Sequence, residues 1–348
     1  MKIAIAMSGG VDSSVAAALL QKEGHDVIGV TMRHFDNARY GFAENEGIQQ
    51  AITDAAKVCD KLGIPHHVIN TSEDFYRIVE TNFIEEYKNG RTPNPCTLCN
   101  PTIKWGVFHD QVLKLGVEKM ATGHYVKLIE KNGKFLIYTA ADSNKDQSYY
   151  LWALNQKQLS KTLFPISHLT KPEVRRIAAE FDLPVHEKTD SQEICFIKDH
   201  YEDYLKKHLE FKPGNIVLSD GKIIGKHRGL QLYTIGQRKG LNTPWSSALF
   251  VLKLDVEKNE LVVTENPDDL LVSEFHLNKV NWIDEIPGEE DKISVQIRYN
   301  SNPVPVQKLE YCEESLKVIL KNAVRAVTPG QSAVFYRGDL LLGGGVIV

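Results

Sequence analysis

The sequence has no apolar run of about 18 residues, which is the length that a membrane-spanning helix requires. Residues Met1 to Met7 form a short apolar run, without the basic start and small-residue cleavage site of a signal peptide. Low-complexity tracts and internal repeats are also missing. These absences argue against a membrane partner and against disorder, and they predict a folded cytoplasmic protein.

Cysteine is scarce, with five residues in a chain of 348. An odd number scattered over a long chain argues against a secreted disulfide framework and indicates reduced thiols, some of them reactive. Cys59 has apolar neighbours in a helical pattern, and Cys312 lies in a strand-rich stretch. Both are predicted to be buried and inert.

The chain also lacks an excess of positive charge, because its formal net charge is −4. Affinity for nucleic acid depends largely on Lys and Arg, so any RNA-binding surface must be local. Residues 204–241 carry eight Lys or Arg against two Asp or Glu. This window is a candidate RNA contact, and a solvated basic face explains it equally well.

Strands and helices alternate through the first 200 residues, which predicts a doubly wound parallel α/β sheet in a domain over 1–200. Short strands and Gly turns follow, predicting a small, partly basic central domain over 201–270, and then a C-terminal β-barrel over 271–348. The expected strands are 2–7, 26–32, 66–70 and 119–122, and the expected helices are 13–23, 48–62, 75–87, 107–115 and 171–181.

The segment Ser8-Gly9-Gly10-Val11-Asp12-Ser13 lies between the first strand and the first helix. A Gly pair at such a turn lets the backbone approach an anion, while the helix N-terminus directs N–H groups at it. The segment lacks the Lys of a P-loop and the third Gly of a dinucleotide fingerprint. It resembles the PP-loop of the ATP pyrophosphatases, and the alternative is an ordinary capped helix start.

The resemblance to a PP-loop implies an ATP site. Asp12 would help to hold Mg²⁺, and Met32 and Gly123, at the ends of later strands, would complete the site. By residue type alone, Met32 would be a core residue and Gly123 a plain turn. The predicted ATP-binding residues are Ala6, Met7, Ser8, Gly9, Gly10, Val11, Asp12, Ser13, Met32 and Gly123.

The segment Thr92–Asn100 has two prolines and an Asn before Cys96-x-x-Cys99, which predicts a stiff, exposed loop with reactive thiols. Lys104 is near enough in sequence to lower a thiol pKa. Cys195 follows at the end of the α/β region. A structural zinc site would need a fourth ligand, His109 or His124, and the spacing selects neither. An adenylating loop together with reactive cysteines indicates sulfur transfer.

Over nearly its whole length the chain resembles the bacterial tRNA-specific 2-thiouridylases. The resemblance rests on Ser8–Ser13, Gly90–Asn100, Ala121–Tyr125, Asp142–Tyr150, the stretch around Cys195 (190–196), Thr234–Leu241, Ala326–Phe335 and Gly343–Gly345. It implies an enzyme that adenylates the C2 carbonyl oxygen of the wobble uridine in the tRNAs for Lys, Glu and Gln. Sulfur then replaces this oxygen, and AMP and pyrophosphate are released. A cysteine desulfurase or relay protein would supply the sulfur to a monomeric enzyme.

The same resemblance implies roles for individual residues. Cys99 would be the nucleophile, and Cys195 would carry a persulfide and then form a disulfide with Cys99. Asn94, Pro95 and Cys96 would face the target base. The residues implied to contact tRNA are His124, Lys145, Asp146, Gln147, Arg298, Tyr299 and Gln331. By residue types alone, 145–147 would be a polar turn and 298–299 a strand edge.

Cys96 departs from the family pattern, because many relatives carry Asp at this position. Cys96, Cys99 and Cys195 would be one thiolate short of a fully cysteine-bound four-iron four-sulfur cluster, leaving one iron free for sulfide. A cluster mechanism therefore stands beside the persulfide route. Two further hypotheses are a different PP-loop reaction, although no glutaminase-like segment is present, and a tRNA-binding or iron–sulfur protein without turnover.

Overall fold

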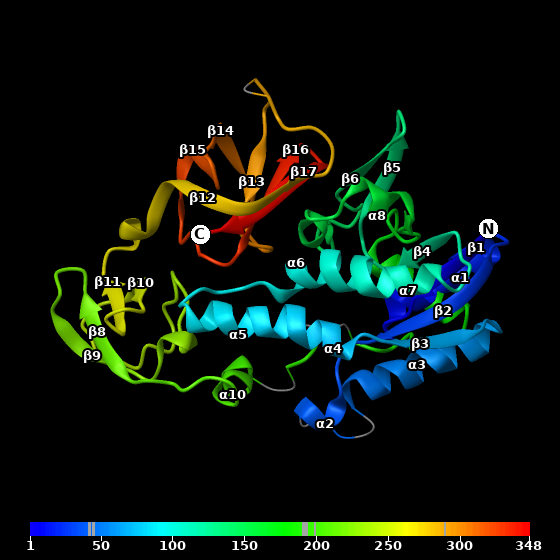
Figure 1. Cartoon of the computed structure of the whole chain (residues 1–348), viewed down its shortest axis with the longest axis horizontal. Helices are drawn as coiled ribbons and strands as arrows, with labels where there is room; N and C mark the ends of the chain where they lie inside the picture. The colour runs from blue at the N-terminus through cyan, green and yellow to red at the C-terminus, as the bar shows by residue number, and fades with distance from the viewer. Residues whose placement is uncertain (41–42, 44–45, 190–193, 198–199, 289) are drawn as a thin grey trace.

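The computed structural model describes residues 1–40, 43, 46–189, 194–197, 200–288 and 290–348. It contains three sheets, which Figure 1 shows as separate parts of the molecule. Figure 1 places the N-terminal sheet and the central sheet toward opposite ends of the long axis, with the barrel beside both. Across the described residues, no helix combines the length and the apolar character needed to cross a lipid bilayer.

The N-terminal sheet has five parallel strands in the order β3-β2-β1-β4-β7. They are β1 (Lys2–Ala6), β2 (Asp26–Arg33), β3 (His66–Asn70), β4 (Lys119–Thr122) and β7 (Thr162–Leu163). The chain leaves β1 toward β2 on one side and meets β4 on the other, so the strand order reverses between β1 and β4. Ligands of such sheets bind at the carboxyl ends of the strands flanking this point.

Helices cover both faces of this sheet, which confirms the predicted doubly wound α/β fold. On one face, β1 packs through Ile3 and Ile5 against α1 (Val11–Lys22), α3 (Gly47–Leu62) and α9 (Lys171–Glu180). On the other face, Ala4 of β1 packs against Trp105, Phe108 and other large side chains. The alternate residues of one strand therefore belong to two different cores.

Two long helical segments contain π-helical turns. The first is α4 (Ser72–Phe75), η1 (Tyr76–Glu80) and α5 (Thr81–Lys88), and the second is α6 (Pro95–Cys99), η2 (Asn100–Phe108) and α7 (His109–Leu113). The remaining short helices are α2 (Asn37–Tyr40), η3 (Ser148–Leu151), α8 (Gln156–Ser160), α10 (Tyr201–Lys206), η4 (Leu230–Leu232) and η5 (Pro267–Leu270). In Figure 1, α5 extends toward the central sheet, and a Cβ added to Gly90 just beyond it would lie 2.7 Å from a methyl of Val256.

The central sheet has the order β10-β11-β8-β9, with β8 (Gly214–Leu218), β9 (Ile223–His227), β10 (Phe250–Asp255) and β11 (Glu260–Thr264). The last six strands are β12 (Leu271–Trp282), β13 (Ser294–Gln296), β14 (Val304–Tyr311), β15 (Leu316–Arg325), β16 (Ser332–Arg337) and β17 (Leu340–Ile347). They run in the order β12-β15-β14-β13-β16-β17, and β17 pairs again with β12. This closure confirms the predicted C-terminal β-barrel.

The barrel is joined to the N-terminal region by a shared sheet and a shared core, which the sequence did not predict. The hairpin β5 (Lys127–Lys131) and β6 (Lys134–Tyr138) pairs with β17, where Tyr138 faces Leu340. Trp152 and Ile137 then pack in one cluster with Tyr336 and Leu341 of the barrel. Because this core is continuous, the barrel is held firmly against the α/β sheet.

The two cysteines predicted to be inert differ. Cys59 is fully buried against β2, and burial raises the pKa of its thiol to about 12, so this prediction is confirmed. Cys312 is exposed, so the prediction of a buried thiol is wrong there. It lies just after β14, at the turn into β15, and strand-rich sequence does not distinguish a turn residue from its flanking strands.

Candidate active site

The loop between β1 and α1 is shaped by two glycines. Gly9 has φ +71°, and a Cβ at this position would lie 2.4 Å from the carbonyl oxygen of Ala51 in α3. Gly10 is the N-cap of α1, and no side chain caps the helix. The N–H groups at this helix start are therefore available for an anion. The loop is fixed from within, since the Ser13 hydroxyl accepts from the N–H of Ser8 at 3.2 Å.

Asp12 in the first turn of α1 is held by two residues that are distant in sequence. The ammonium of Lys171 lies 2.7 Å and 2.9 Å from its two carboxylate oxygens, and the Tyr125 hydroxyl donates to Oδ1 at 2.8 Å. Lys171 is 8% exposed. The carboxylate that the sequence assigned to Mg²⁺ therefore lies at the anion loop with its charge balanced by lysine.

Gly123 and Met32 lie at the ends of β4 and β2, as predicted. A Cβ at Gly123 would lie 2.6 Å from the Ser13 backbone nitrogen, so glycine here allows the end of β4 to approach the first turn of α1. Met32 is half-buried between two apolar clusters. Its contact with adenine stays a prediction, as does a contact between Gly123 and the nucleotide.

Cys96 and Cys99 lie on a helix, so the predicted stiff loop is wrong. Asn94 is the N-cap of α6, its side chain accepts from the Cys96 N–H at 3.2 Å, and Pro95 occupies the first helical position. Proline is tolerated there because that N–H has no helical partner, and asparagine is a favoured N-cap. The residues that disfavour a helix interior here start one.

The three candidate thiols interact with one another electrostatically. Cys96 and Cys195 are exposed by accessible area and Cys99 is half-buried, yet protein atoms surround all three closely enough for desolvation to raise their pKa values. The pKa of Cys99 rises to about 12. The pKa of Cys195 is raised chiefly by burial, and the nearby Cys96 and Cys99 raise it further. The three thiols therefore lie among closely packed protein atoms even where part of their surface is accessible. With raised pKa values, they are protonated at neutral pH.

Lys104 is the cation that opposes these shifts. Its charge lowers the pKa of Cys96, Cys99 and Cys195, although burial outweighs it. Cys99 is the residue before η2, and Lys104 lies five positions later, which is the spacing of neighbours along a π-helix. The π-helical turn therefore brings the ammonium toward the thiols.

His124 holds Lys104. Burial lowers the pKa of His124 well below its usual value, and Lys104 lowers it further, so the ring is neutral. The lysine ammonium has only donors, and its Nζ lies 3.2 Å from Nε2, which must accept. Nδ1–H then donates to the Thr122 hydroxyl at 2.8 Å. The predicted tRNA contact at His124 stays untested, and the structure gives the residue an internal role.

The raised pKa of Cys99 predicts how its reactivity depends on pH. The thiolate is the reactive form, so alkylation by iodoacetamide should accelerate about tenfold per pH unit, without a plateau up to pH 10. Lys104→Met removes the charge that lowers this pKa, so alkylation should slow several-fold at each pH. Mass spectrometry of the peptide containing Cys99 measures this, with Cys312 in the same sample as the internal reference. Equal rates in both proteins would show that Lys104 does not act on this thiol.

Three predicted tRNA contacts make hydrogen bonds within the protein. The Asp146 carboxylate accepts from the Ala140 N–H at 2.8 Å, and burial raises its pKa. The Gln147 side chain accepts from the Tyr125 N–H at 3.0 Å, next to the phenol that holds Asp12. Tyr299 donates to the Asp146 carbonyl at 3.1 Å. Lys145 in the same turn is half-buried.

Gln331 and Arg298 lie where the three parts of the chain meet. The Gln331 amide donates to the Thr92 carbonyl at 2.7 Å, just before α6. The Arg298 guanidinium donates to the carbonyls of Ala326, at 2.7 Å, and Ile235, at 3.2 Å, and it also contacts the Thr328 hydroxyl. Both residues thus fix the junction between the barrel, the central sheet and the segment before α6, and their tRNA contacts stay predictions.

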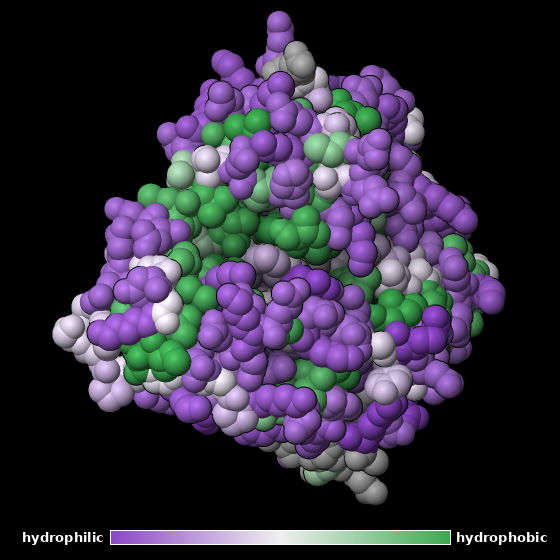
Figure 2. Space-filling view, turned by 60° about the vertical axis from the view of Figure 1, so that its left-hand side comes forward, coloured by the Kyte–Doolittle hydropathy of each residue, from purple (hydrophilic) through white to green (hydrophobic). Residues whose placement is uncertain are grey.

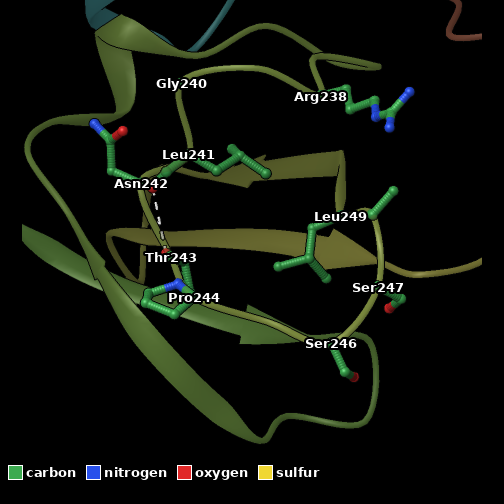
Figure 3. A pocket seen from close by; sticks show the side chains of 10 residues that line it. Arg238, Gly240, Leu241, Asn242, Thr243, Pro244, Ser246, Ser247 and Leu249 are labelled. Atoms are coloured by element: carbon green, nitrogen blue, oxygen red, sulfur yellow. Dashed lines mark hydrogen bonds between the residues drawn. The ribbon is translucent and has the colours of Figure 1, made fainter.

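The central basic window forms an open surface. All eight of its Lys and Arg residues are exposed: Lys206, Lys207, Lys212, Lys222, Lys226, Arg228, Arg238 and Lys239. A cavity of about 580 Å³ is lined by Arg238, Asn242 and neighbouring residues of the segment before β10. Figure 3 shows their side chains. In Figure 2, hydrophilic side chains cover much of this side of the molecule, and apolar ones gather around a hollowed area near its centre.

The cluster hypothesis finds no support in the arrangement of side chains. Within the part of the chain that the structure describes, no three His, Cys, Asp or Glu side chains are grouped to hold a metal ion. Residues 190–193, which belong to the segment matched around Cys195, lie outside the described residues.

Sequence reasoning missed several residues of the site. Lys171, Tyr125 and Lys188 all lie at the anion loop, where the Lys188 ammonium lies 3.0 Å from the Gly9 carbonyl and 2.7 Å from Asp54. His34, at the end of β2, has a buried Nε2 for which no described residue provides a hydrogen bond, and burial lowers its pKa to about 4. A lysine at the first position of α9, where the helix dipole disfavours cations, was the one available signal.

The fold and the loop define a PP-loop nucleotide-binding protein with two appended β domains. The family described as "tRNA methyl transferase HUP domain" matches residues 1–199, "tRNA methyl transferase PRC-barrel domain" matches 202–265, and "Aminomethyltransferase beta-barrel domain" matches 272–347. The "tRNA-specific 2-thiouridylase MnmA" of Trichlorobacter lovleyi is 44% identical, over 99% of this chain and 97% of that protein. The protein of the same name from Clostridioides difficile is 43% identical, over 99% and 98%. The chain therefore belongs to the tRNA-specific 2-thiouridylase (MnmA) family.

Proposed function

We propose that this protein catalyses the ATP-dependent 2-thiolation of the wobble uridine in the tRNAs for Lys, Glu and Gln. One observation carries the proposal: Cys96, Cys99 and Cys195 interact with one lysine, Lys104, in a chain whose β1–α1 loop is built for an anion. The relatives' printed name supports both the tRNA substrate and the thiolation.

The first half of the reaction activates the base. The C2 carbonyl oxygen of uridine attacks the α-phosphate of ATP, an O–P bond forms, and pyrophosphate leaves with the electrons of the broken P–O bond. The loop from Ser8 to Ser13 binds the phosphates through backbone N–H groups. Mg²⁺ neutralises phosphate charge when it is bound, and Asp12 is the carboxylate that would hold it.

The second half transfers sulfur. The terminal sulfur of a Cys195 persulfide bonds to C2, and AMP leaves with the former carbonyl oxygen. The Cys99 thiolate then attacks the Cys195 sulfur and breaks the S–S bond, leaving sulfur on the base and a disulfide between Cys99 and Cys195. A dithiol reductant restores the two thiols, and a cysteine desulfurase or relay protein reloads Cys195. Lys104 favours the Cys99 thiolate that this step needs.

The substrate RNA would lie across the junction of the three parts of the chain. Asn94, Pro95 and Cys96 begin the catalytic helix, so they would face the target base. The exposed lysines and arginines of the central window would bind phosphates, since they give this window a net positive charge in a chain whose net charge is −4. Lys145 and the residues at the barrel junction would contribute further contacts.

The competing route uses an iron–sulfur cluster, and the third cysteine, Cys96, is the observation that favours it. The test is anaerobic purification with assays for iron and sulfide, followed by thiolation of a wobble-uridine tRNA with ATP. Wild type is compared with Cys96→Ala and with Cys312→Ala. The second variant removes an exposed cysteine that lies far from Cys96 in sequence.

We expect iron-free protein, 2-thiouridine from wild type and from Cys312→Ala, and retained product from Cys96→Ala. Iron in stoichiometric amount, with loss of both iron and product in Cys96→Ala, would replace the persulfide route by the cluster route. Absence of thiolation by wild type with ATP, tRNA and a persulfide donor would refute the proposed function itself.

A further inference from the structure

Lys171 occupies an unusual position for a lysine. It is the first residue of α9, where the helix dipole disfavours a positive charge, and its side chain is 10% exposed. Burying an ammonium is costly unless a strong partner accepts it. The partner is Asp12, whose two oxygens lie 2.7 Å and 2.9 Å from Nζ.

The backbone around Lys171 is fixed, so the position of its ammonium is set by the fold. The side chains of Thr170 and Glu173 form a capping box at the start of α9, and Pro172 follows at the second helical position. The Lys171 N–H donates to Asp142 at 2.9 Å. The flexible stem of Lys171 is then the part that can move, while Asp12 stays in the first turn of α1.

Asp12 cannot serve Lys171 and a metal ion fully at once. The Tyr125 hydroxyl also donates to Oδ1 at 2.8 Å, so lysine and tyrosine both engage the carboxylate. A Mg²⁺ ion arriving with ATP would compete for the same oxygens, and the β- and γ-phosphates would bring new anionic oxygens to the adjacent loop. The displaced ammonium would then lie beside the start of α1, where the loop N–H groups also face.

We propose that Lys171 is a pyrophosphate-binding residue, which pairs with Asp12 as the structure shows and transfers to the β- and γ-phosphates when Mg·ATP binds. In the adenylation step it stabilises the charge that develops on the leaving pyrophosphate as the P–O bond breaks. The role of Lys171 in the adenylation step rests on the proposed function. Its role in binding phosphates rests only on the anion loop.

The test compares the binding of Mg·ATP, Mg·pyrophosphate and AMP by calorimetry in wild type, Lys171→Met and Lys61→Met. AMP lacks the phosphates that Lys171 would contact. Lys61 is the matched control, since it forms a lysine–aspartate pair with Asp182 on the surface, with an Nζ to Oδ2 distance of 2.6 Å. Thermal unfolding and AMP binding show whether each variant is folded.

We expect Lys171→Met to weaken ATP and pyrophosphate by about 10- to 100-fold, in line with a charge-assisted hydrogen bond, and AMP by less than about threefold. Lys61→Met should match wild type for all three ligands. Equal weakening of ATP and AMP would make Lys171 a structural residue of the loop, and unchanged ATP and pyrophosphate binding would also overturn the inference.

Three further results keep the outcomes separate. If Lys171→Met does not fold, the ratio of ATP to AMP affinity is measured in Lys171→Gln, and a ratio equal to that of wild type overturns the inference. If wild type thiolates tRNA but Lys171→Met binds ATP normally, the inference fails and the proposed function stands. Wild type that binds neither ATP nor pyrophosphate refutes both.

Discussion

Replacing Cys99 with alanine is expected to abolish 2-thiouridine formation, with a loss of turnover on the order of 10³-fold or more, as for other removed nucleophiles. Cys99 is the half-buried thiol at the end of α6, and Lys104 lies five residues further along the π-helical turn. Without this thiol, the sulfur on Cys195 has no partner to release it. Liquid chromatography of nucleosides from the product tRNA measures the result.

The controls separate chemistry from folding. Cys312→Ala should keep wild-type turnover, because this exposed thiol lies outside the catalytic helix. Cys99→Ala should retain ATP-dependent adenylation of the tRNA, which is seen as pyrophosphate release before sulfur transfer. Appreciable 2-thiouridine from Cys99→Ala would remove this residue from the mechanism.

Gly9→Ala is expected to weaken ATP binding by about 100-fold. Left-handed backbone costs a residue with a side chain roughly 1–2 kcal/mol, and overpacking typically adds another 1–3 kcal/mol. Gly9 has φ +71°, and its Cβ would approach the Ala51 carbonyl oxygen to 2.4 Å. Because that neighbour is helix backbone, the loop itself must shift away from the phosphates. Calorimetric titration with Mg·ATP measures the loss.

Two other glycines serve as matched controls. Gly24 after α1 has φ +81° with no atom within 4 Å of its Cβ position, so Gly24→Ala carries only the backbone cost. It should lower stability by about 1 kcal/mol and leave ATP binding unchanged. Gly10 has φ −103°, and its Cβ would meet only the Ser8 hydroxyl, at 3.4 Å, so Gly10→Ala should have a milder effect than Gly9→Ala. Equal ATP affinities in Gly9→Ala and Gly24→Ala would contradict this interpretation of the loop.

The predicted α/β elements correspond closely to those observed, because local patterns specify them. The expected strand 66–70 is β3, and the helix expected at 48–62 is α3, which ends at Gly63 in the left-handed conformation. Alternation along strands and glycine at helix ends are properties of neighbouring residues. The anion loop is also specified by a local pattern, since its glycines and Asp12 lie within six consecutive residues.

The error at Cys96 and Cys99 shows where local rules are ambiguous. Two prolines close together usually exclude a helix, yet Pro95 stands at the position that tolerates it, after a capping Asn94. The observed helix also depends on distant support, because Asn100 donates to the Tyr150 carbonyl at 2.9 Å. No pattern near Cys96 predicts that bond.

The predicted tRNA contacts illustrate a second limit. Gln331, Arg298 and Asp146 make hydrogen bonds inside the protein. Sequence resemblance identifies such positions as important without separating a contact to RNA from a contact that shapes the site. The structure shows the internal contacts, and binding measurements on single variants are needed for the RNA contacts.

The sequence by itself determined the order of the strands and helices of the α/β sheet and the anion loop, because each depends on residues close together in the chain. Tertiary structure alone decided that Lys171 lies on Asp12, 159 residues away, and that β6 pairs with β17 of the barrel. It also decided that Thr92 is held by Gln331 of the barrel. Such contacts follow from how the layers pack, because burial and closure of the barrel bring together residues that no local pattern relates.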